Sequence, residues 1–319
     1  MRKLSTLLLL ALALLGPVLA PAQTLKVTLL GTGAPIPNIE RFGPSILVEA
    51  GPTKLLFDCG RGVSQRLWQL RIPLGTVNTV FFTHLHSDHV VGFPDLWLTG
   101  WLPGVYGRRA TPLRLFGPAG TQAMAAALKQ AYAWDLGVRA DQGPPSAGAT
   151  VAATDIAAGV VFEQDGVRVT AFEVAHGEHL KPAFGYRVDY AGRSVVLSGD
   201  TGFSENLIRA AQGTDLLVHE VAAARPELLR ASETARQILS YHTLPEDAAR
   251  VFNRVKPRLA VYSHIVLLTT DPAVPPPAAA ELLPRTRATY AGPLELGEDL
   301  MTIEIGPEFA VRRFVPVKR

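Results

Sequence analysis

The 319-residue sequence contains a single cysteine, Cys59. One thiol excludes an internal disulfide framework, and it also excludes a zinc site built from cysteine thiolates. A chain with one thiol has nothing to mispair in an oxidising compartment. Ligands for a metal site must then come from the eight histidines and from carboxylates.

Net charge is also small. The chain has 31 Lys and Arg residues against 28 Asp and Glu residues, and without Arg2 and Lys3, which fall in a predicted leader, the count is 29 against 28. The isoelectric point of the whole chain is about 9.1, but the near-neutral balance gives no broad electrostatic case for nucleic-acid binding, and we expect no nucleic-acid partner. Hydrophobic residues make up 48% of the chain, which excludes a disordered protein.

Long apolar runs are confined to the first residues of the chain. A short cationic start precedes an almost wholly apolar run at residues 4–15, and Ala20-Pro21-Ala22 provides a small-x-small cleavage site. The run is too short to span a bilayer comfortably. We therefore predict a cleaved signal peptide at 1–22, a single domain at 23–319, and a periplasmic or secreted protein with no stable membrane association. An uncleaved membrane anchor is the alternative.

Short runs of β-branched and aromatic residues alternate with helical or turn segments from residue 25 onward. Strands are predicted at residues 25–30, 45–49, 54–57, 77–82, 167–174, 184–190, 194–197, 216–218 and 259–262. Helices are predicted at 121–134 and 245–255, and loops at 142–149 and 272–277. The pattern favours two similar β-rich halves with helices outside.

The strongest chemical signal is THLHSDH at residues 83–89, directly after the strand predicted at 77–82. Side chains repeat every two residues along a strand, so His84 and His86 share a face. The chain then turns, which lets Asp88 and His89 approach the same hollow from another direction. Three imidazoles and a carboxylate within six residues suit zinc, with manganese or iron as alternatives.

The HxHxDH motif after an apolar strand resembles the signature of the metallo-β-lactamase superfamily. Further segments, in the right order along the chain, resemble the branch that contains ribonuclease Z and its hydrolytic relatives. These segments are Gly31-Thr32-Gly33-Ala34-Pro35, Phe57-Asp58-Cys59-Gly60, Phe184-Gly185-Tyr186-Arg187, Ser198-Gly199-Asp200-Thr201, His219-Glu220 and Tyr262-Ser263-His264. The resemblance implies an α/β protein with an αββα four-layer sandwich, in which two mixed β-sheets are flanked by helices and two metal ions bind at one edge.

The resemblance also implies the ligands of two divalent metal ions, most simply Zn²⁺. The first ion would take His84, His86, His176 and Asp200, and the second Asp88, His89, Asp200 and His264. Asp200 would bridge the two ions. His179 is a rival for the place of His176, and the His-Gly pair at the predicted strand end favours His176.

Such a pair of ions activates a shared water for attack on an ester. Asp88 is a candidate to carry a proton from that water to the leaving group. His242 and Glu220 resemble the ribonuclease Z pair that relays a proton or holds a phosphate. The alternative for His242 is a flank of the following helix with no catalytic part. Asp58 is expected to orient a ligand histidine, and His219 to support packing.

The substrate is predicted from what the chain lacks. Only 23 residues separate His176 from Asp200, too few for the long arm with which a tRNA-processing ribonuclease Z grips its substrate. With the export leader, this argues against a ribonuclease Z-type 3′ tRNA endonuclease. The prediction is an exported hydrolase of a phosphodiester or related small-molecule ester, and the sequence leaves a homodimer open. The alternatives are an arylsulfatase or lactonase, with Trp97 and Trp101 as pocket wall rather than core, or a non-catalytic metal-binding protein.

Overall fold

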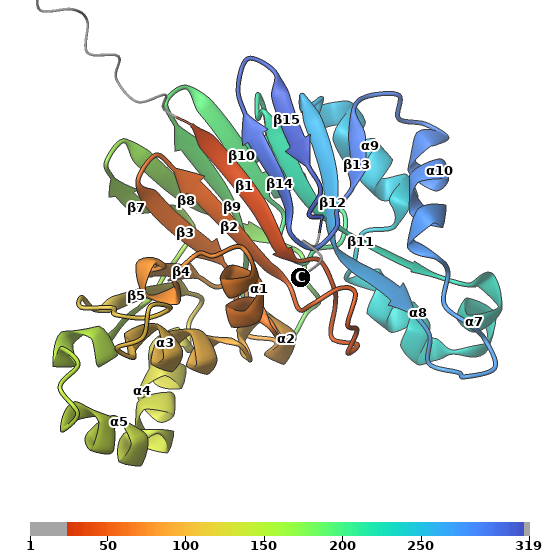
Figure 1. Cartoon of the computed structure of the whole chain (residues 1–319). Helices are drawn as coiled ribbons and strands as arrows, with labels where there is room; N and C mark the ends of the chain where they lie inside the picture. Colours follow the sequence, from red (N-terminus) through yellow and green to blue (C-terminus); the bar gives the residue numbers. More distant parts are fainter. Residues whose placement is uncertain (1–23, 316–319) are drawn as a thin grey trace, which may run out of the picture.

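The computed structural model describes residues 24–315, which fold as two β-sheets packed face to face with helices on both outer faces (Figure 1). The predicted αββα sandwich is confirmed. The first sheet has the strand order β15-β14-β1-β2-β3-β4-β5-β6. Its strands are β1 (Leu25–Gly31), β2 (Ser45–Ala50), β3 (Thr53–Phe57), β4 (Thr79–Phe81), β5 (Leu113–Gly117), β6 (Val151–Asp155), β14 (Met301–Ile305) and β15 (Phe309–Arg312).

The second sheet is drawn from the second half of the chain, in the order β13-β12-β11-β10-β9-β8-β7. Its strands are β7 (Gly159–Gln164), β8 (Val167–Val174), β9 (Ala183–Tyr190), β10 (Arg193–Leu197), β11 (Leu216–Ala224), β12 (Leu259–Leu268) and β13 (Leu294–Leu296). Both sheets are mixed: hairpins such as β2–β3 pair antiparallel, whereas β3–β4 and β11–β12 pair parallel through helical crossovers. The two β-rich halves predicted from the sequence are thus the two sheets, except that β14 and β15 return to the first.

The main core lies between the sheets. The inward-facing side chains of the central strands are buried, including Val27 and Phe81 from the first sheet and Val188 and Val218 from the second. Phe81 stacks on Phe57 with 5.0 Å between ring centroids. Each such side chain contributes about 1.5–3 kcal/mol by leaving water, so the core fixes how one sheet sits on the other.

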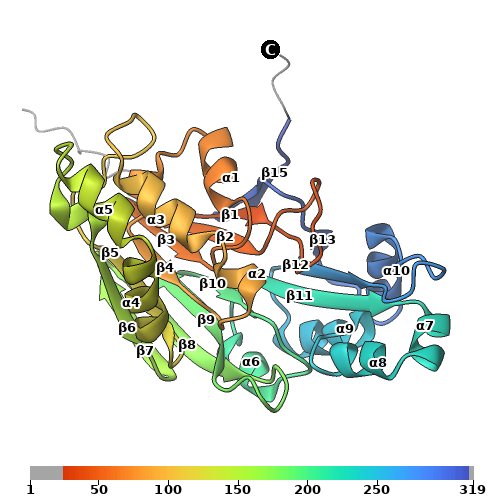
Figure 2. The same ribbon diagram turned by 90° about the horizontal axis from the view of Figure 1, so that it is seen from below.

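Helices cover the two outer faces (Figure 2). Those on the side of the first sheet are α1 (Val63–Gln69), α2 (Ser87–Val90), α3 (Phe93–Trp101), α4 (Thr121–Ala131) and α5 (Ala133–Ala140), with the 3-10 turns η1 (Leu74–Thr76) and η2 (Ser146–Ala149). Those on the side of the second sheet are α6 (Glu205–Ala210), α7 (Pro226–Ala231), α8 (Glu233–Ser240), α9 (Pro245–Val255) and α10 (Leu282–Arg287), with η3 (Ala279–Glu281). No helix of the described part of the chain is both long enough and apolar enough to cross a membrane.

Helix α9 has the predicted bounds, because its end signals are local. Pro245 occupies the first turn, where its missing N–H costs nothing, and Glu246 and Asp247 follow where the helix dipole favours acidic side chains. The helix ends at Lys256, which takes a left-handed conformation with φ 52°. The single helix predicted at residues 121–134 is instead broken at Tyr132, whose ring packs edge-on against Trp97.

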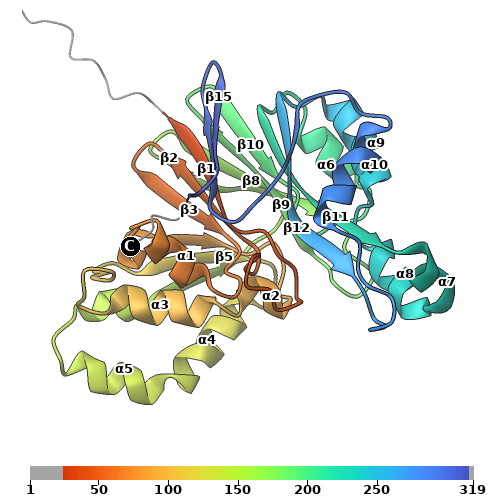
Figure 3. The ribbon, with the colours of Figure 1, turned by 45° about the vertical axis from the view of Figure 1, so that its right-hand side comes forward.

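Strands β11 and β12 run further than predicted. The sequence indicated ends at Val218 and Tyr262, but the two strands stay paired to Ala224 and Leu268. The alanines at the end of β11 are poor strand formers, so the extension depends on tertiary packing. It is covered by α7 and α8, which bury Leu228 and Leu239 against it (Figure 3).

Candidate metal centre

The predicted ligands come together at one edge of the two sheets. Strand β4 ends at Phe81, and the next residues carry His84 and His86 to the start of α2, which holds Asp88 and His89. The second sheet supplies the remaining ligands. His176 follows β8, Asp200 follows β10, and His264 lies within β12.

A bulge aims His264 at this edge. Ser263 pairs with Glu220 on β11, and the next pair joins Ile265 to Val221, so His264 is an extra residue in β12. Its φ of 42° is left-handed. An inserted residue of this kind bends a strand and redirects its side chain, which is why bulges recur beside functional sites. The prediction that β12 ends before His264 is therefore wrong. The bulge, and not the end of the strand, directs His264 toward the other ligands.

The first group of donors contains three imidazoles. Nδ1 of His86 lies 3.0 Å from Nε2 of His84 and 3.2 Å from Nε2 of His176. Oδ2 of Asp200 is 3.9 Å from Nε2 of His84 and 3.8 Å from Nε2 of His176. The three imidazole nitrogens lie within 4.8 Å of one another, and the Asp200 carboxylate lies beside two of them.

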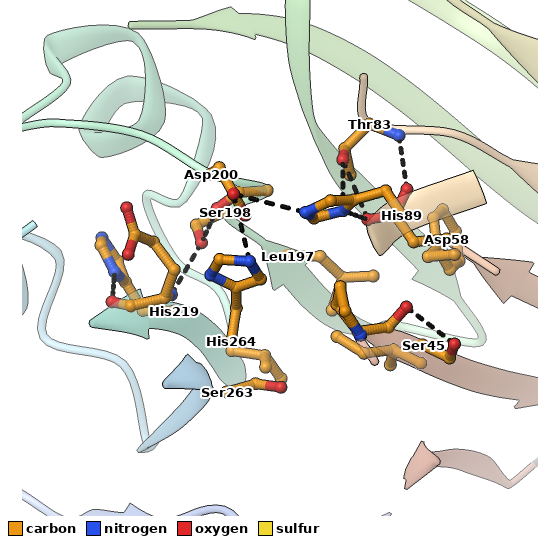
Figure 4. A pocket seen from close by; sticks show the side chains of 16 residues that line it. Ser45, Asp58, Thr83, His89, Leu197, Ser198, Asp200, His219, Ser263 and His264 are labelled. Atoms are coloured by element: carbon orange, nitrogen blue, oxygen red, sulfur yellow. Dashed lines mark hydrogen bonds and ion pairs between the residues drawn. The ribbon is translucent and has the colours of Figure 1, made fainter. Parts of the chain in front are cut away.

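The second group contains two imidazoles and two carboxylates. Nε2 of His89 is 3.5 Å from Oδ2 of Asp88 and 3.3 Å from Oδ2 of Asp200. Nε2 of His264 is 3.4 Å and 3.2 Å from the same two oxygens. Oδ2 of Asp200 therefore belongs to both groups, and Figure 4 shows it between His89 and His264.

Asp58 fixes the ring orientation of two of these histidines. Its Oδ2 accepts a hydrogen bond from Nδ1 of His89 at 2.8 Å and another from the hydroxyl of Thr83 at 2.9 Å. Because the Thr83 hydroxyl proton points to Asp58, its oxygen can only accept from Nδ1 of His84, 2.9 Å away. In the neutral form of each imidazole, Nε2 is then the unprotonated nitrogen and faces the other ligand atoms. Burial lowers the pKa of His89, but the Asp200 and Asp58 carboxylates outweigh burial and raise it, so an ion bound there would displace a proton from His89.

His176 is oriented in the same way by the backbone. Its Nδ1 donates to the carbonyl oxygen of Tyr241 at 3.1 Å, so Nε2 faces the first group. His176 is buried, whereas His179 is exposed and makes no contact with either group. Burial lowers the pKa of His84 and of His176, which favours the neutral imidazole that binds metals.

The donor set fits two divalent ions. Nε2 of His89 and Oδ1 of Asp200 are buried and have no hydrogen-bond partner among residues 24–315. Unpaired buried polar atoms are costly, and ions at the two points would give the inward-facing nitrogens their partners. Nitrogen and carboxylate oxygen donors in groups of four suit zinc and its first-row neighbours.

Glu220 and His242 lie beside the donor groups. Oε1 of Glu220 accepts hydrogen bonds from the backbone N–H groups of Thr201 and Thr243 at 3.0 and 3.1 Å, and it lies 3.1 Å from Nδ1 of His242. Burial lowers the pKa of His242, but the Glu220 carboxylate outweighs burial and raises it to about 9. The His242 ring is 5.1 Å from that of His176 and 5.7 Å from that of His264, measured between centroids.

The other residues considered from the sequence lie apart from the metal-ligand atoms. Trp97 and Trp101 belong to the core: their indole N–H groups donate to the carbonyl oxygens of Ala149 and Pro145, which fastens the loop around η2 to α3. His219 packs edge-on against Phe252, and its Nδ1–H donates to the carbonyl oxygen of Glu220. Cys59 is fully buried.

Two groups that hydrogen-bond to ligand histidines, Thr83 and the Tyr241 carbonyl, could not be identified from the sequence. Thr83 stands directly before His84, and only its position next to the motif could have marked it. The Tyr241 carbonyl is a backbone group, which any residue type supplies. Its position depends on the turn between α8 and α9.

Comparison with known proteins agrees with this geometry. Residues 53–265 match the model of the beta-lactamase superfamily domain. The chain is 35% identical over 291 residues to a protein named Ribonuclease Z from Mycobacterium sp. (strain KMS), covering 90% of this chain and 99% of that protein. It is 34% identical over 287 residues to a Ribonuclease Z from Mycobacterium bovis (strain BCG / Pasteur 1173P2), covering 89% and 99%.

Solved structures show the same fold. The human short-form tRNase Z superposes with a TM-score of 0.65 at 22% identity, covering 87% of this chain and 98% of that one. The metallo-beta-lactamase fold protein YhfI from Bacillus subtilis superposes with a TM-score of 0.68 at 15% identity, covering 88% and 99%. The chain belongs to the metallo-β-lactamase superfamily, in the branch that resembles ribonuclease Z. It is a metallohydrolase of the phosphodiesterase type, which sets aside the alternative of a non-catalytic metal-binding protein.

These relatives overturn the predicted function and partner. The predictions of a small-ester substrate and of no nucleic-acid partner are wrong, because curated proteins named Ribonuclease Z match this chain over 99% of their own length. An alignment of 291 residues that takes in nearly all of such a protein leaves no room for a long arm that this chain lacks. The short spacing between His176 and Asp200 therefore does not separate this chain from them. The predicted leader at 1–22 lies outside the described residues, so export stays a prediction.

Proposed function

We propose that this protein is a metal-dependent endoribonuclease of the ribonuclease Z type, which cleaves a phosphodiester bond on the 3′ side of a precursor tRNA. The observation that carries the proposal is the 35% identity, along nearly the whole of both chains, to a protein named Ribonuclease Z. The site supports it, because two groups of three ligand atoms converge, from His84, His86 and His176 and from Asp88, His89 and His264. Oδ2 of Asp200 lies beside both, 3.8 Å from Nε2 of His176 and 3.2 Å from Nε2 of His264.

The proposed ligands follow the two groups. His84, His86, His176 and Asp200 would hold the first ion, and Asp88, His89, Asp200 and His264 the second. Five of these seven side chains are histidines, a nitrogen-rich set that favours Zn²⁺, with Mn²⁺ or iron as the alternatives. When bound, two divalent ions would lower the pKa of a water molecule and offset the charge that develops on a phosphoryl group.

The chain's own residues would move the protons. The Asp88 carboxylate lies beside Nε2 of both His89 and His264, where it can accept a proton from the attacking water. The departing ribose oxygen needs a proton in turn. Glu220 favours the protonated form of His242, and His242 lies next to both donor groups. His242 is therefore the proposed general acid, and Glu220 holds its ring in place.

The RNA must be held without an arm. Between His176 and Asp200 the structure has a short loop followed by the β9–β10 hairpin, whose strands remain within the second sheet. Surfaces beside the donor groups are left to bind the RNA. Since the chain has little net charge, affinity would depend on local contacts more than on a broad basic field.

The test is cleavage of a precursor tRNA that carries a 3′ trailer. Purified protein loaded with Zn²⁺ should release the trailer by one cut on the 3′ side of the discriminator base, and Asp200→Ala should release none. The matched control substrate is an unstructured RNA of the same composition. If a chromogenic phosphodiester is hydrolysed while the precursor tRNA stays intact at high enzyme concentration, the proposed substrate is wrong although the site is active.

A further inference from the structure

The histidines proposed to bind the metals through Nε2 differ in what holds the other ring nitrogen. A metal-binding imidazole almost always donates from its second nitrogen to a carboxylate, a carbonyl or a water, which fixes the tautomer. Nδ1 of His84 bonds to Thr83, Nδ1 of His89 to Asp58, and Nδ1 of His176 to Tyr241. Nδ1 of His264 is buried and has no hydrogen-bond partner anywhere in residues 24–315.

Two buried acceptors near His264 are also unpaired. They are Oε2 of Glu220 and Oδ1 of Asp200, neither of which accepts a hydrogen bond from the described residues. Glu220, Asp200 and His264 are 2%, 3% and 5% exposed, and all three line one cavity of about 30 Å³. Figure 4 shows Asp200 and His264 at this cavity. A ring nitrogen of His264 and a carboxylate oxygen of Glu220 lie within 4.8 Å of each other.

One water molecule matches these groups in number and polarity. A cavity needs about 10–15 Å³ to hold a water, and the water needs two to four polar partners. Here it would accept from Nδ1–H of His264 and donate one proton to Oε2 of Glu220. A cation in the same place would be opposed, because it would face the Nδ1–H that His264 carries when its Nε2 binds a metal.

We propose that a buried water joins Glu220 to Nδ1 of His264, so that Glu220 positions a ligand of the second ion as well as His242. The inference rests on the proposed ligands of the second ion and not on the RNA substrate. The two carboxylate oxygens then have separate tasks: Oε1 holds His242 and two backbone N–H groups, and Oε2 holds His264 through the water.

The first test measures release of Zn²⁺ from the loaded full-length protein to a chelator, with no substrate present. Glu220→Gln should weaken the second ion by about 10–100-fold, the usual effect of removing such a partner. Asp58→Asn should weaken both ions, because Asp58 holds His89 directly and His84 through Thr83. His242→Ala is the matched control, since it removes the partner of Oε1 and leaves the water in place, so both ions should remain bound as in the unchanged protein. Wild-type metal affinity in Glu220→Gln, or an equal loss in His242→Ala, overturns the proposal.

The second test does not depend on a variant that folds. A high-resolution crystal structure of the Zn²⁺-loaded protein should show a water within hydrogen-bond distance of both Nδ1 of His264 and Oε2 of Glu220. A direct bond between them, an empty cavity or a third metal ion there overturns the proposal. None of these results depends on RNA cleavage, so a failure of the proposed function is distinguishable from a failure of this inference.

Discussion

Replacing His176 with alanine removes one of the four donors of the first group, whereas replacing His179 removes an exposed side chain three residues further on. Nε2 of His176 lies 3.2 Å from Nδ1 of His86 and 3.8 Å from Oδ2 of Asp200. His179 has no such neighbours among the described donors. The two substitutions remove the same group from the same loop, so each controls for the other.

The expected magnitude follows from the number of donors. Four-ligand zinc sites in small proteins bind with about 10–16 kcal/mol, so one donor is worth about 3 kcal/mol, which is about a 100-fold change in affinity. His176→Ala should weaken the first ion by that factor and leave the second ion bound, because Asp88, His89 and His264 are untouched. His179→Ala should leave both affinities unchanged.

Metal analysis after dialysis against a graded series of chelator concentrations measures both affinities. His176→Ala should lose one ion per chain at chelator concentrations that the unchanged protein tolerates. The assignment is refuted if His179→Ala loses metal and His176→Ala does not. Circular dichroism of both variants checks that the loop change has not unfolded the chain.

Asp200→Ala removes the carboxylate shared by both donor groups, so metal content should fall well below two ions per chain, with hydrolysis lost; two retained ions would contradict the bridging role. His242→Ala removes no proposed ligand, so both ions should stay while turnover falls by about 10²–10⁴-fold, and full turnover would exclude His242 as the acid. Stripping the ions should lower the free energy of unfolding by about 2.7 kcal/mol per ion when each is present at 100 times its Kd, which chemical denaturation measures; unchanged stability would show that the ions do not bind the folded chain. Edman sequencing of protein from a native exporter should begin at Gln23 if the leader is cleaved after Ala22, and full-length protein in the cytosol would contradict export.

Local signals predicted the parts of this protein that local chemistry determines. The HxHxDH motif lies between a strand end and one turn of helix, so its side chains are brought together locally. The strand spacing expected for His84 and His86 is wrong, because β4 ends at Phe81 and both residues lie in the segment after it. Helix α9 begins where predicted because its proline and acidic residues lie in its own first turn, and it ends at Val255, just before Lys256 in a left-handed conformation.

Features set by tertiary packing were not predicted. The ends of β11 and β12 depend on α7 and α8, which no property of the strands reveals. The bulge at His264 depends on pairing with β11. The roles of Trp97 and Trp101 stayed open because their spacing fits a core as well as a pocket wall, and only their bonds to the loop around η2 decide it.

The substrate prediction was wrong for a different reason. The prediction depended on the low net charge, the missing arm and the predicted export leader, and none of these bears on the reacting groups. Whole-chain charge averages over a surface on which many arginines are paired with carboxylates, such as Arg225 with Glu281 and Arg254 with Glu205. The relatives that this chain matches also leave no room for a long arm, so its absence does not exclude an RNA substrate. The metal-ligand residues indicate a metallohydrolase, and the similarity to proteins named Ribonuclease Z is what supports the RNA substrate.

The two donor groups also explain why the sandwich has to be rigid at this edge. The first sheet supplies His84, His86, Asp88 and His89, and the second supplies His176, Asp200 and His264. The contacts of Asp200 with His84 and His89 therefore join one sheet to the other. Two hydrogen bonds fix the crossing: Phe184 N–H donates to the Thr83 carbonyl at 2.9 Å, and the Tyr186 hydroxyl donates to the Phe82 carbonyl at 2.7 Å. Both tie β9 to the segment just before His84. A shift of about 1 Å between the sheets would be enough to misplace reacting groups, and these two bonds hold the motif in register with the second sheet before any ion binds.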